Sequence, residues 1–294
     1  NSAEHEKNQG RKVLNVPNLR FPEFKGEWKY FLINDVCSEF KSGKNIKADS
    51  VFECGEYPVY GGNGLRGYTS SYNHEGSYVL IGRQGALCGN VRSVYGKTYI
   101  TEHAIAVAGN EKSNTNFLHY LFLKMNLGQY SDQSAQPGLA VNKLLKLKVA
   151  LPIISEQTKI AKLLSLLDER IATQNKIIDK LQSLIKGITQ KNVRSNKPNV
   201  RLTECLECKS STLQESEVCE QGTYPVYGAN GIVGYLDNYN TEGEAVYIIK
   251  DGSGVGTVSY VTGKCSATGT LNTLQAKEGY SLQYFYYLLK VFNF

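Results

Sequence analysis

The chain has 294 residues, of which 41% are hydrophobic and 20% charged, a composition typical of globular proteins and sufficient for two domains. Its net charge of +6 permits contact with phosphates without indicating it. No apolar run reaches the ~18 residues of a membrane span, the polar residues 1–15 do not form a secretion signal, and seven cysteines are an odd number for a disulfide framework. We therefore expect a cytoplasmic protein with reduced thiols and no membrane contact.

The first half of the chain predicts an α+β domain. Residues 78–81, 91–95 and 104–108 are short runs rich in β-branched and aromatic side chains, separated by turns that contain glycine, which is typical of strands. Residues 117–127 place apolar side chains at a helical period, so a packed helix is expected there.

A long helix is predicted over residues 156–191, with Ser155 as its N-cap. At ~1.5 Å per residue it would be about 50 Å long. Apolar residues recur along it in alternating steps of four and three, as in a coiled-coil seam, which favours pairing with another long helix over an ordinary amphipathic helix lying on its own domain. The seam residues expected at this subunit interface are Ile160, Leu164, Leu167, Ile171, Ile178, Leu181, Ile185 and Ile188, with Gln174 as a polar member.

The sequence before the predicted helix is repeated after it. The motif Tyr-Pro-Val-Tyr-Gly at residues 57–61 recurs at 224–228, and residues 56–127 align without a gap with 223–294. Roughly 26 of about 72 aligned positions are identical, which indicates a duplicated domain. The predicted organisation is a first domain at 15–151, a helical spacer at 152–192 and a second domain at 193–294.

No catalytic constellation is recognisable in the sequence. Three of the four histidines, His74, His103 and His119, have no histidine at the aligned position of the other copy. Residues 252–256 resemble a phosphate loop, but strand-like residues follow where a helix should begin, so a hairpin turn is predicted. A zinc site is an alternative for four cysteines, although no second Cys-x-x-Cys supports it: Cys205, Cys208, Cys219 and Cys265. We expect no enzymatic activity and no metal.

The loops of both copies instead offer groups suited to DNA. Arginine can address guanine O6 and N7 together, and Gln or Asn can address adenine N6 and N7. If two copies share a frame but read different bases, the reading positions should differ, as Arg66 and Val233 do. The candidate DNA-binding residues are Tyr60, Asn63, Arg66, Tyr68, Arg83, Gln84, Asn90, Arg92, Lys97, Lys143, Asn230, Tyr235, Lys250, Asp251 and Lys264, with Lys97 and Lys264 expected on phosphates.

From about Asn15 onward the sequence resembles the specificity subunits of type I restriction-modification enzymes. Beside the duplicated motif, the resemblance is carried by the opening of the first domain, by a short stretch that begins with glutamine and proline, and by the entry into the long helix. These features are Leu19-Arg20-Phe21-Pro22-Glu23-Phe24, Glu27-Trp28, Gln136-Pro137-Gly138-Leu139, and Leu151-Pro152 followed by Glu156-Gln157, Ile160, Leu166-Leu167-Asp168 and Ile171.

The resemblance implies a bacterial protein in which each copy is a target recognition domain and paired helices set the separation of two half-sites. It implies a split double-stranded DNA target methylated on adenine, two methyltransferase (M) subunits, and restriction (R) subunits in the full complex. S-adenosylmethionine, ATP and Mg²⁺ would be used by those partners.

The sequence stops at Phe294, the counterpart of Leu127, whereas complete family members are expected to have a second long helix after the second domain. The helix partner is then expected from a second copy or from a further segment, or it is absent. A rival interpretation is a helix-mediated protein-interaction module that does not read DNA.

Overall fold

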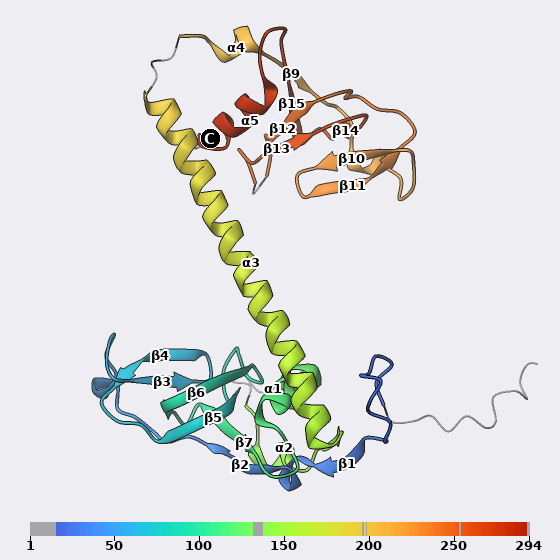
Figure 1. Cartoon of the computed structure of the whole chain (residues 1–294). Coiled ribbons are helices and arrows are strands. Elements are labelled where there is room, and N and C mark those ends of the chain that lie inside the picture. The colour runs from blue at the N-terminus through green and yellow to red at the C-terminus, as the bar shows by residue number, and fades with distance from the viewer. Residues whose placement is uncertain (1–15, 132–137, 196, 198, 253, 293–294) are drawn as a thin grey trace, which may run out of the picture. The chain divides into compact units, whose positions relative to one another are not determined.

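The computed structural model describes residues 16–131, 138–195, 197, 199–252 and 254–292 (Figure 1). The sequence features at Asn15, Gln136, Pro137 and Phe294 therefore lie outside the described residues. The chain forms two compact units, Asn1–Ile171 and Ala172–Phe294. Among the described residues, no helix is both long enough and apolar enough to cross a membrane.

The first unit is built on a six-stranded sheet of order β2-β7-β5-β6-β3-β4. Neighbouring strands are antiparallel except β3 and β6, which are parallel with Val59 opposite Tyr99. A separate antiparallel pair joins β1 to β8. The strands are β1 (Lys29–Leu32), β2 (Cys37–Ser42), β3 (Tyr57–Gly61), β4 (Gly64–Thr69), β5 (His74–Gly82), β6 (Val91–Ile100), β7 (Ala104–Gly109) and β8 (Lys148–Leu151). The three strands predicted from the sequence are parts of β5, β6 and β7.

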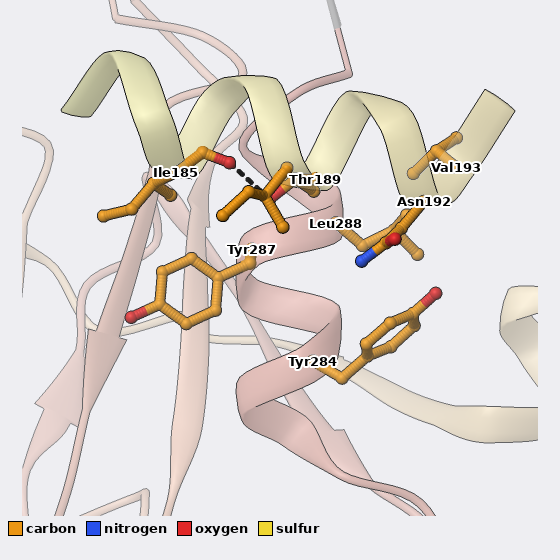
Figure 2. A pocket seen from close by; sticks show the side chains of 8 residues that line it. Ile185, Thr189, Asn192, Val193, Tyr284, Tyr287 and Leu288 are labelled. Atoms are coloured by element: carbon orange, nitrogen blue, oxygen red, sulfur yellow. Dashed lines mark hydrogen bonds between the residues drawn. The ribbon is translucent and has the colours of Figure 1, made fainter. Parts of the chain in front are cut away.

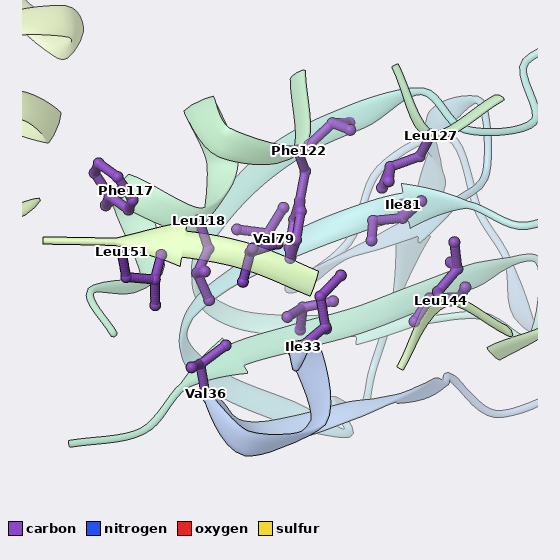
Figure 3. Close-up of a cluster of buried hydrophobic side chains, with 14 of the residues drawn as sticks. Ile33, Val36, Val79, Ile81, Phe117, Leu118, Phe122, Leu127, Leu144 and Leu151 are labelled. Atoms are coloured by element: carbon purple, nitrogen blue, oxygen red, sulfur yellow. The ribbon is translucent and has the colours of Figure 1, made fainter. Parts of the chain in front are cut away.

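Alternate side chains of the central strands face two different cores, because successive residues of a strand point to opposite faces. One face, with Val79 and Ile81, packs against Leu118 and Phe122 of the helix α1 (Figure 3). The other face, which includes Leu80, Val94 and Ile100, forms a smaller cluster. Burial on both faces holds the sheet rigid beneath the loops at its edge.

Helix α1 (Thr115–Met125) begins two residues before the predicted start and ends two residues before the predicted end. Asn114 caps it by accepting a hydrogen bond from Phe117 N at 3.0 Å, and Asn126 ends it in the left-handed conformation with φ of 48°. Short helical elements complete the unit: η1 (Ile33–Asp35), η2 (Ala48–Ser50), η3 (Leu127–Tyr130) and α2 (Val141–Leu144).

The long helix α3 (Ile154–Ser195) is confirmed, but Ser155 is not its N-cap. The backbone N–H groups of Glu156 and Gln157 already donate to Ile153 O, so the first turn closes on Ile153 and Ser155 lies within the helix. Both Glu156 and Gln157 are fully buried. This entry into α3 is therefore part of the core of the first unit.

Two buried side chains fix the first turn of α3. Glu156 accepts two hydrogen bonds of 2.7 Å from the Arg20 guanidinium and one of 3.3 Å from Trp28 Nε1. Gln157 accepts from Asn114 N, and its Nε2 donates to the carbonyl oxygens of residues 112 and 152, each at 2.9 Å. The residues that carry the family resemblance at this junction thus have a structural role.

The second unit repeats the strand arrangement in two sheets, of order β13-β12-β15-β9 and β11-β10-β14. Its elements are α4 (Leu202–Cys205), β9 (Leu206–Ser210), η4 (Glu215–Glu217), β10 (Tyr224–Gly228), β11 (Gly231–Leu236), β12 (Ala245–Ile249), β13 (Val258–Val261), β14 (Ser266–Ala267), β15 (Leu271–Ala276) and α5 (Leu282–Leu289). Together β13 and β14 occupy the span that aligns with β6. Strand β13 follows the predicted turn at 252–256, of which Ser253 lies outside the described residues.

An asparagine clamp occurs at the same place in both units. The Asn73 side chain exchanges two hydrogen bonds with the backbone of Ile100, at 2.8 and 2.9 Å, and Asn240 does the same with Ala267 at 3.0 Å. His74 Nδ1 lies 2.6 Å from Asn73 Oδ1, and in the second unit the hydroxyl of Thr241 donates to Asn240 Oδ1. His74 is thus a buried structural residue.

The carboxyl group of Glu39 faces this histidine. Burial raises its pKa, but hydrogen bonds from Lys41 and His74 and their charges outweigh that effect, so the pKa of Glu39 lies below its usual value. A lowered folded-state pKa stabilises the first unit above the unfolded-state pKa of about 4.3, and this stability is lost as pH falls through the folded-state value.

We expect Glu39→Gln to remove this acid-dependent contribution. Denaturant unfolding followed by the fluorescence of Trp28, the single tryptophan of the sequence, reports on the first unit. Its stability should differ between the wild type and the variant above about pH 4.5, and the two curves should converge toward lower pH. Curves that stay parallel over the whole range would contradict the assigned role of Glu39.

Candidate nucleic-acid interface

The tip of the β3–β4 hairpin meets two other turns of the first unit. Thr101 N donates to Tyr60 O at 2.8 Å, and Arg83 N donates to His103 O at 2.9 Å. At Gly62 a Cβ atom would lie 2.7 Å from His103 O, so only glycine permits this close approach. The hairpin tip, the turn after β5 and the turn between β6 and β7 therefore form one surface, called here the first tip.

The second unit builds an equivalent surface, the second tip, from the β10–β11 hairpin, with the same backbone hydrogen bonds. Thr268 N donates to Tyr227 O at 2.9 Å, and Lys250 N donates to Thr270 O at 3.0 Å. Each of these four residues is 167 positions beyond its counterpart. The duplication is thus visible in individual hydrogen bonds as well as in the sequence. The shared backbone places the Cα atoms of the two tips in equivalent positions.

The first tip gathers several of the predicted DNA-binding side chains. A Cβ at Gly61 would lie 2.9 Å from Arg66 Cδ, and one at Gly64 would lie 3.2 Å from Arg92 Cζ, so both arginines lie against the hairpin. The other predicted residues that the tip brings together are Tyr60, Asn63, Arg83, Gln84 and Asn90. This arrangement presents guanidinium and amide groups on a rigid backbone frame.

His103 and Glu102 also lie at the first tip, although no sequence pattern marks them. His103 Nδ1 lies 3.2 Å from Gln84 Oε1, and its Nε2 lies 3.2 Å from Glu102 Oε1. This contact engages the amide oxygen of Gln84, so the amide nitrogen is the group left to face a ligand. The alignment with Thr270 gave no signal for this role, because contact with Gln84 depends on the fold.

The second tip carries different side chains on the same frame. A Cβ at Gly228 would lie 2.8 Å from Val233 Cγ1 and 2.8 Å from Glu215 Oε1. At Gly231, the counterpart of Gly64, a Cβ would meet no neighbouring atom within 4 Å among the described residues. Asn230 belongs to the hairpin turn, and Lys250 and Asp251 follow β12. Glu215 was missed by sequence reasoning, since it lies upstream of the gap-free alignment.

Five predicted residues lie away from the tips. Tyr68 and Tyr235 form β-bridges with Phe52 and Cys219, near the open end of each hairpin. The Nζ atoms of Lys97 and Lys264 lie over tyrosine rings, 4.8 and 4.7 Å from the centroids of Tyr72 and Tyr239. The same cation–π pair in both units explains, on structural grounds, why a lysine occurs at both aligned positions. Lys143 lies on α2.

The predicted seam of α3 divides into three parts. Ile160 packs against the core of the first unit, and Leu164 is half-buried. Exposed seam residues follow, including Ile171 with 60% of its surface accessible. Near its end α3 lies beside α5 within the second unit, where an apolar pocket is formed (Figure 2) by Ile185, Ile188, Thr189, Asn192, Val193, Tyr284, Tyr287 and Leu288.

All seven cysteines are free thiols. Among the residues that the structure describes, no group of three or more His, Cys, Asp or Glu side chains is placed to hold a metal ion. Cys205 and Cys265, two members of the alternative zinc set, are buried in different hydrophobic clusters.

The family described as "Type I restriction modification DNA specificity domain" matches residues 25–183 and 195–293. The chain is 42% identical over 154 residues to the specificity subunit of the Escherichia coli type I restriction enzyme EcoprrI, and 29% identical over 144 residues to a putative specificity subunit of Haemophilus influenzae. These alignments cover 51% and 48% of this chain but 38% and 37% of those relatives, so the matched region spans well under half of their length.

The crystal structure of the type I restriction-modification S subunit from M. genitalium has a similar fold, with a TM-score of 0.78 and 20% identity, covering 94% of this chain and 79% of that one. The two family matches correspond to the two copies found by internal alignment. The chain therefore belongs to the family of type I restriction-modification DNA specificity domains, and it carries that domain twice.

Proposed function

We propose that this chain is the DNA-recognition subunit of a type I restriction-modification complex and that each unit reads one half of a split target. The observation that carries the proposal is the contrast between the two tips: their backbone hydrogen bonds agree, whereas their exposed side chains differ. A shared frame with different reading groups suits recognition of two different half-sites by direct contact with base edges.

In this proposal the domains at 15–151 and 193–294 contact double-stranded DNA, and the spacer at 152–192 sets their separation. Lysines such as Lys97, Lys143 and Lys264 contact phosphates and supply salt-dependent affinity. Two methyltransferase subunits perform adenine methylation and restriction subunits perform cleavage, using S-adenosylmethionine, ATP and Mg²⁺, while this chain contributes no catalytic group.

The exposed part of the α3 seam supports docking of another helix. Leu167, Ile171, Ile178 and Leu181 follow one another on one face, and each exposes about half of its surface or more. A stripe of this kind is stabilised when it is buried against a partner. A second copy of the chain or a partner subunit would supply that helix. The rival function, a protein-interaction module without DNA recognition, rests on this same surface.

Mapping of DNA methylation in cells with and without the chain, in the presence of its cognate methyltransferase subunit, separates the two functions. We expect a split adenine-methylated motif that requires the chain. A methylation pattern unchanged by the chain, together with retained binding of the methyltransferase subunit, would favour the interaction module instead.

A further inference from the structure

The two domains differ in charge as well as in sequence. Residues 15–151 contain fifteen Lys and Arg against eleven Asp and Glu, whereas residues 193–294 contain eight against ten. The second domain is therefore net negative although DNA is a dense polyanion. Non-specific attraction to phosphates is weaker for this domain, so its contribution to recognition must depend more on contacts with base edges.

The difference is sharpest at the tips. The first tip places the guanidinium groups of Arg66 and Arg92 against the hairpin, as described above. At the aligned positions the second tip has Val233 and Ser259, and the carboxylate of Glu215 occupies the space beside Gly228. Beside the aligned glycines Gly61 and Gly228, a guanidinium in one unit thus corresponds to a carboxylate in the other, on the same backbone frame.

The segment that carries Glu215 is held in place. Gly269 N, in the turn before β15, donates to Leu213 O at 2.7 Å. The short helix η4 that starts at Glu215 has a capping box in which Gln214 N donates to Glu217 Oε2 at 2.8 Å. Glu215 itself is exposed. The backbone that carries Glu215 is therefore held at the tip, and its carboxylate is open to solvent and able to contact a ligand.

A carboxylate only accepts hydrogen bonds and is repelled by phosphates. In the major groove the donors are the exocyclic amino groups, N4 of cytosine and N6 of adenine. We propose that Glu215 is a specificity-determining residue of the second unit that accepts a hydrogen bond from such an amino group. In the first unit Arg66 occupies the corresponding place, beside Gly61, and in this proposal it donates to base acceptors. This inference rests on the proposed function and assigns the chemistry of its second half-site.

The test compares Glu215→Ala and Glu215→Gln with the wild-type chain, each assembled with the cognate methyltransferase subunit. Methylation mapping identifies the motif, and competition binding measures discrimination between the target duplex and duplexes with single base-pair changes. We expect Glu215→Ala to reduce discrimination at one base pair of one half-site by about 5- to 150-fold and to leave the other half-site intact. Glu215→Gln keeps an acceptor and adds a donor, so discrimination at that same base pair should be altered.

Glu220→Ala is the matched control, since it removes the same charge from the same unit beside Cys219, which pairs near the open end of the hairpin. The control should leave the motif unchanged. Equal effects of Glu215→Ala on every sequence, or no effect on either half-site, would overturn the assignment of Glu215 while a split wild-type motif upholds the proposed function. Absence of any chain-dependent motif with the wild type would overturn the proposed function itself.

Discussion

Replacing Gln157 with alanine is expected to lower the free energy of unfolding of the first unit by about 3 kcal/mol. The Gln157 side chain is fully buried and makes three hydrogen bonds, each with a net value of about 1 kcal/mol, and alanine leaves their backbone partners without water in the core. Because two of these bonds join the start of α3 to residues 112 and 114, just before α1, the variant should also weaken the attachment of α3 to the first unit.

The measurement is hydrogen exchange across a denaturant series, read at the amides of residues 112–114 and 154–161, because a chain with two units does not unfold as one two-state system. Gln174→Ala is the control: it makes the same change on the same helix at an exposed position, where an effect within about 0.5 kcal/mol is expected. Similar losses in the two variants would show that the Gln157 contacts do not anchor α3.

Removing both guanidinium groups of the first tip, in Arg66→Ala with Arg92→Ala, should relax recognition in one half-site. Each good contact with a base edge discriminates by about 1–3 kcal/mol, so the double variant should lose up to a few kcal/mol of discrimination at the base pairs read by these side chains. Binding to duplexes with single substitutions in either half-site, measured with the assembled complex, gives this quantity directly.

Arg170→Ala is a suitable control, because it removes one positive charge from an exposed position of α3 away from the first tip. Its expected effect is confined to a small, sequence-independent change in affinity. If the double variant weakens binding equally to all duplexes and merely lowers the salt dependence, Arg66 and Arg92 contact phosphates and other residues read the bases.

Much of the architecture was predictable from the sequence because its signals are periodic or repeated. The 167-residue offset revealed the duplication, the steps of four and three predicted α3, and β-branched runs marked β5, β6 and β7. Errors fell at element ends. Ser155 has the side chain of an N-cap, but the first turn closes on Ile153 because buried partners hold Glu156 and Gln157 there.

The candidate site was predictable only in part. Divergence between aligned loops drew attention to Arg66 and Gln84, and the structure brings them together with Arg92 at one tip, whereas their contact with bases stays a prediction. It also places Lys97 elsewhere, over a tyrosine ring, and adds His103 and Glu215, which no local pattern marks. Those contacts join residues that are distant along the chain.

The sequence by itself determined the duplication, the long helix and the family, since repeats, helical period and motif spacing are properties of neighbouring or regularly spaced residues. The tertiary structure alone decided which side chains share a tip and which charge each tip presents. The physical reason is that backbone hydrogen bonds such as Arg83 N to His103 O and Gly269 N to Leu213 O bring distant turns within contact distance. Only this closure puts the Glu215 carboxylate beside Gly228, where the first unit has the Arg66 guanidinium beside Gly61.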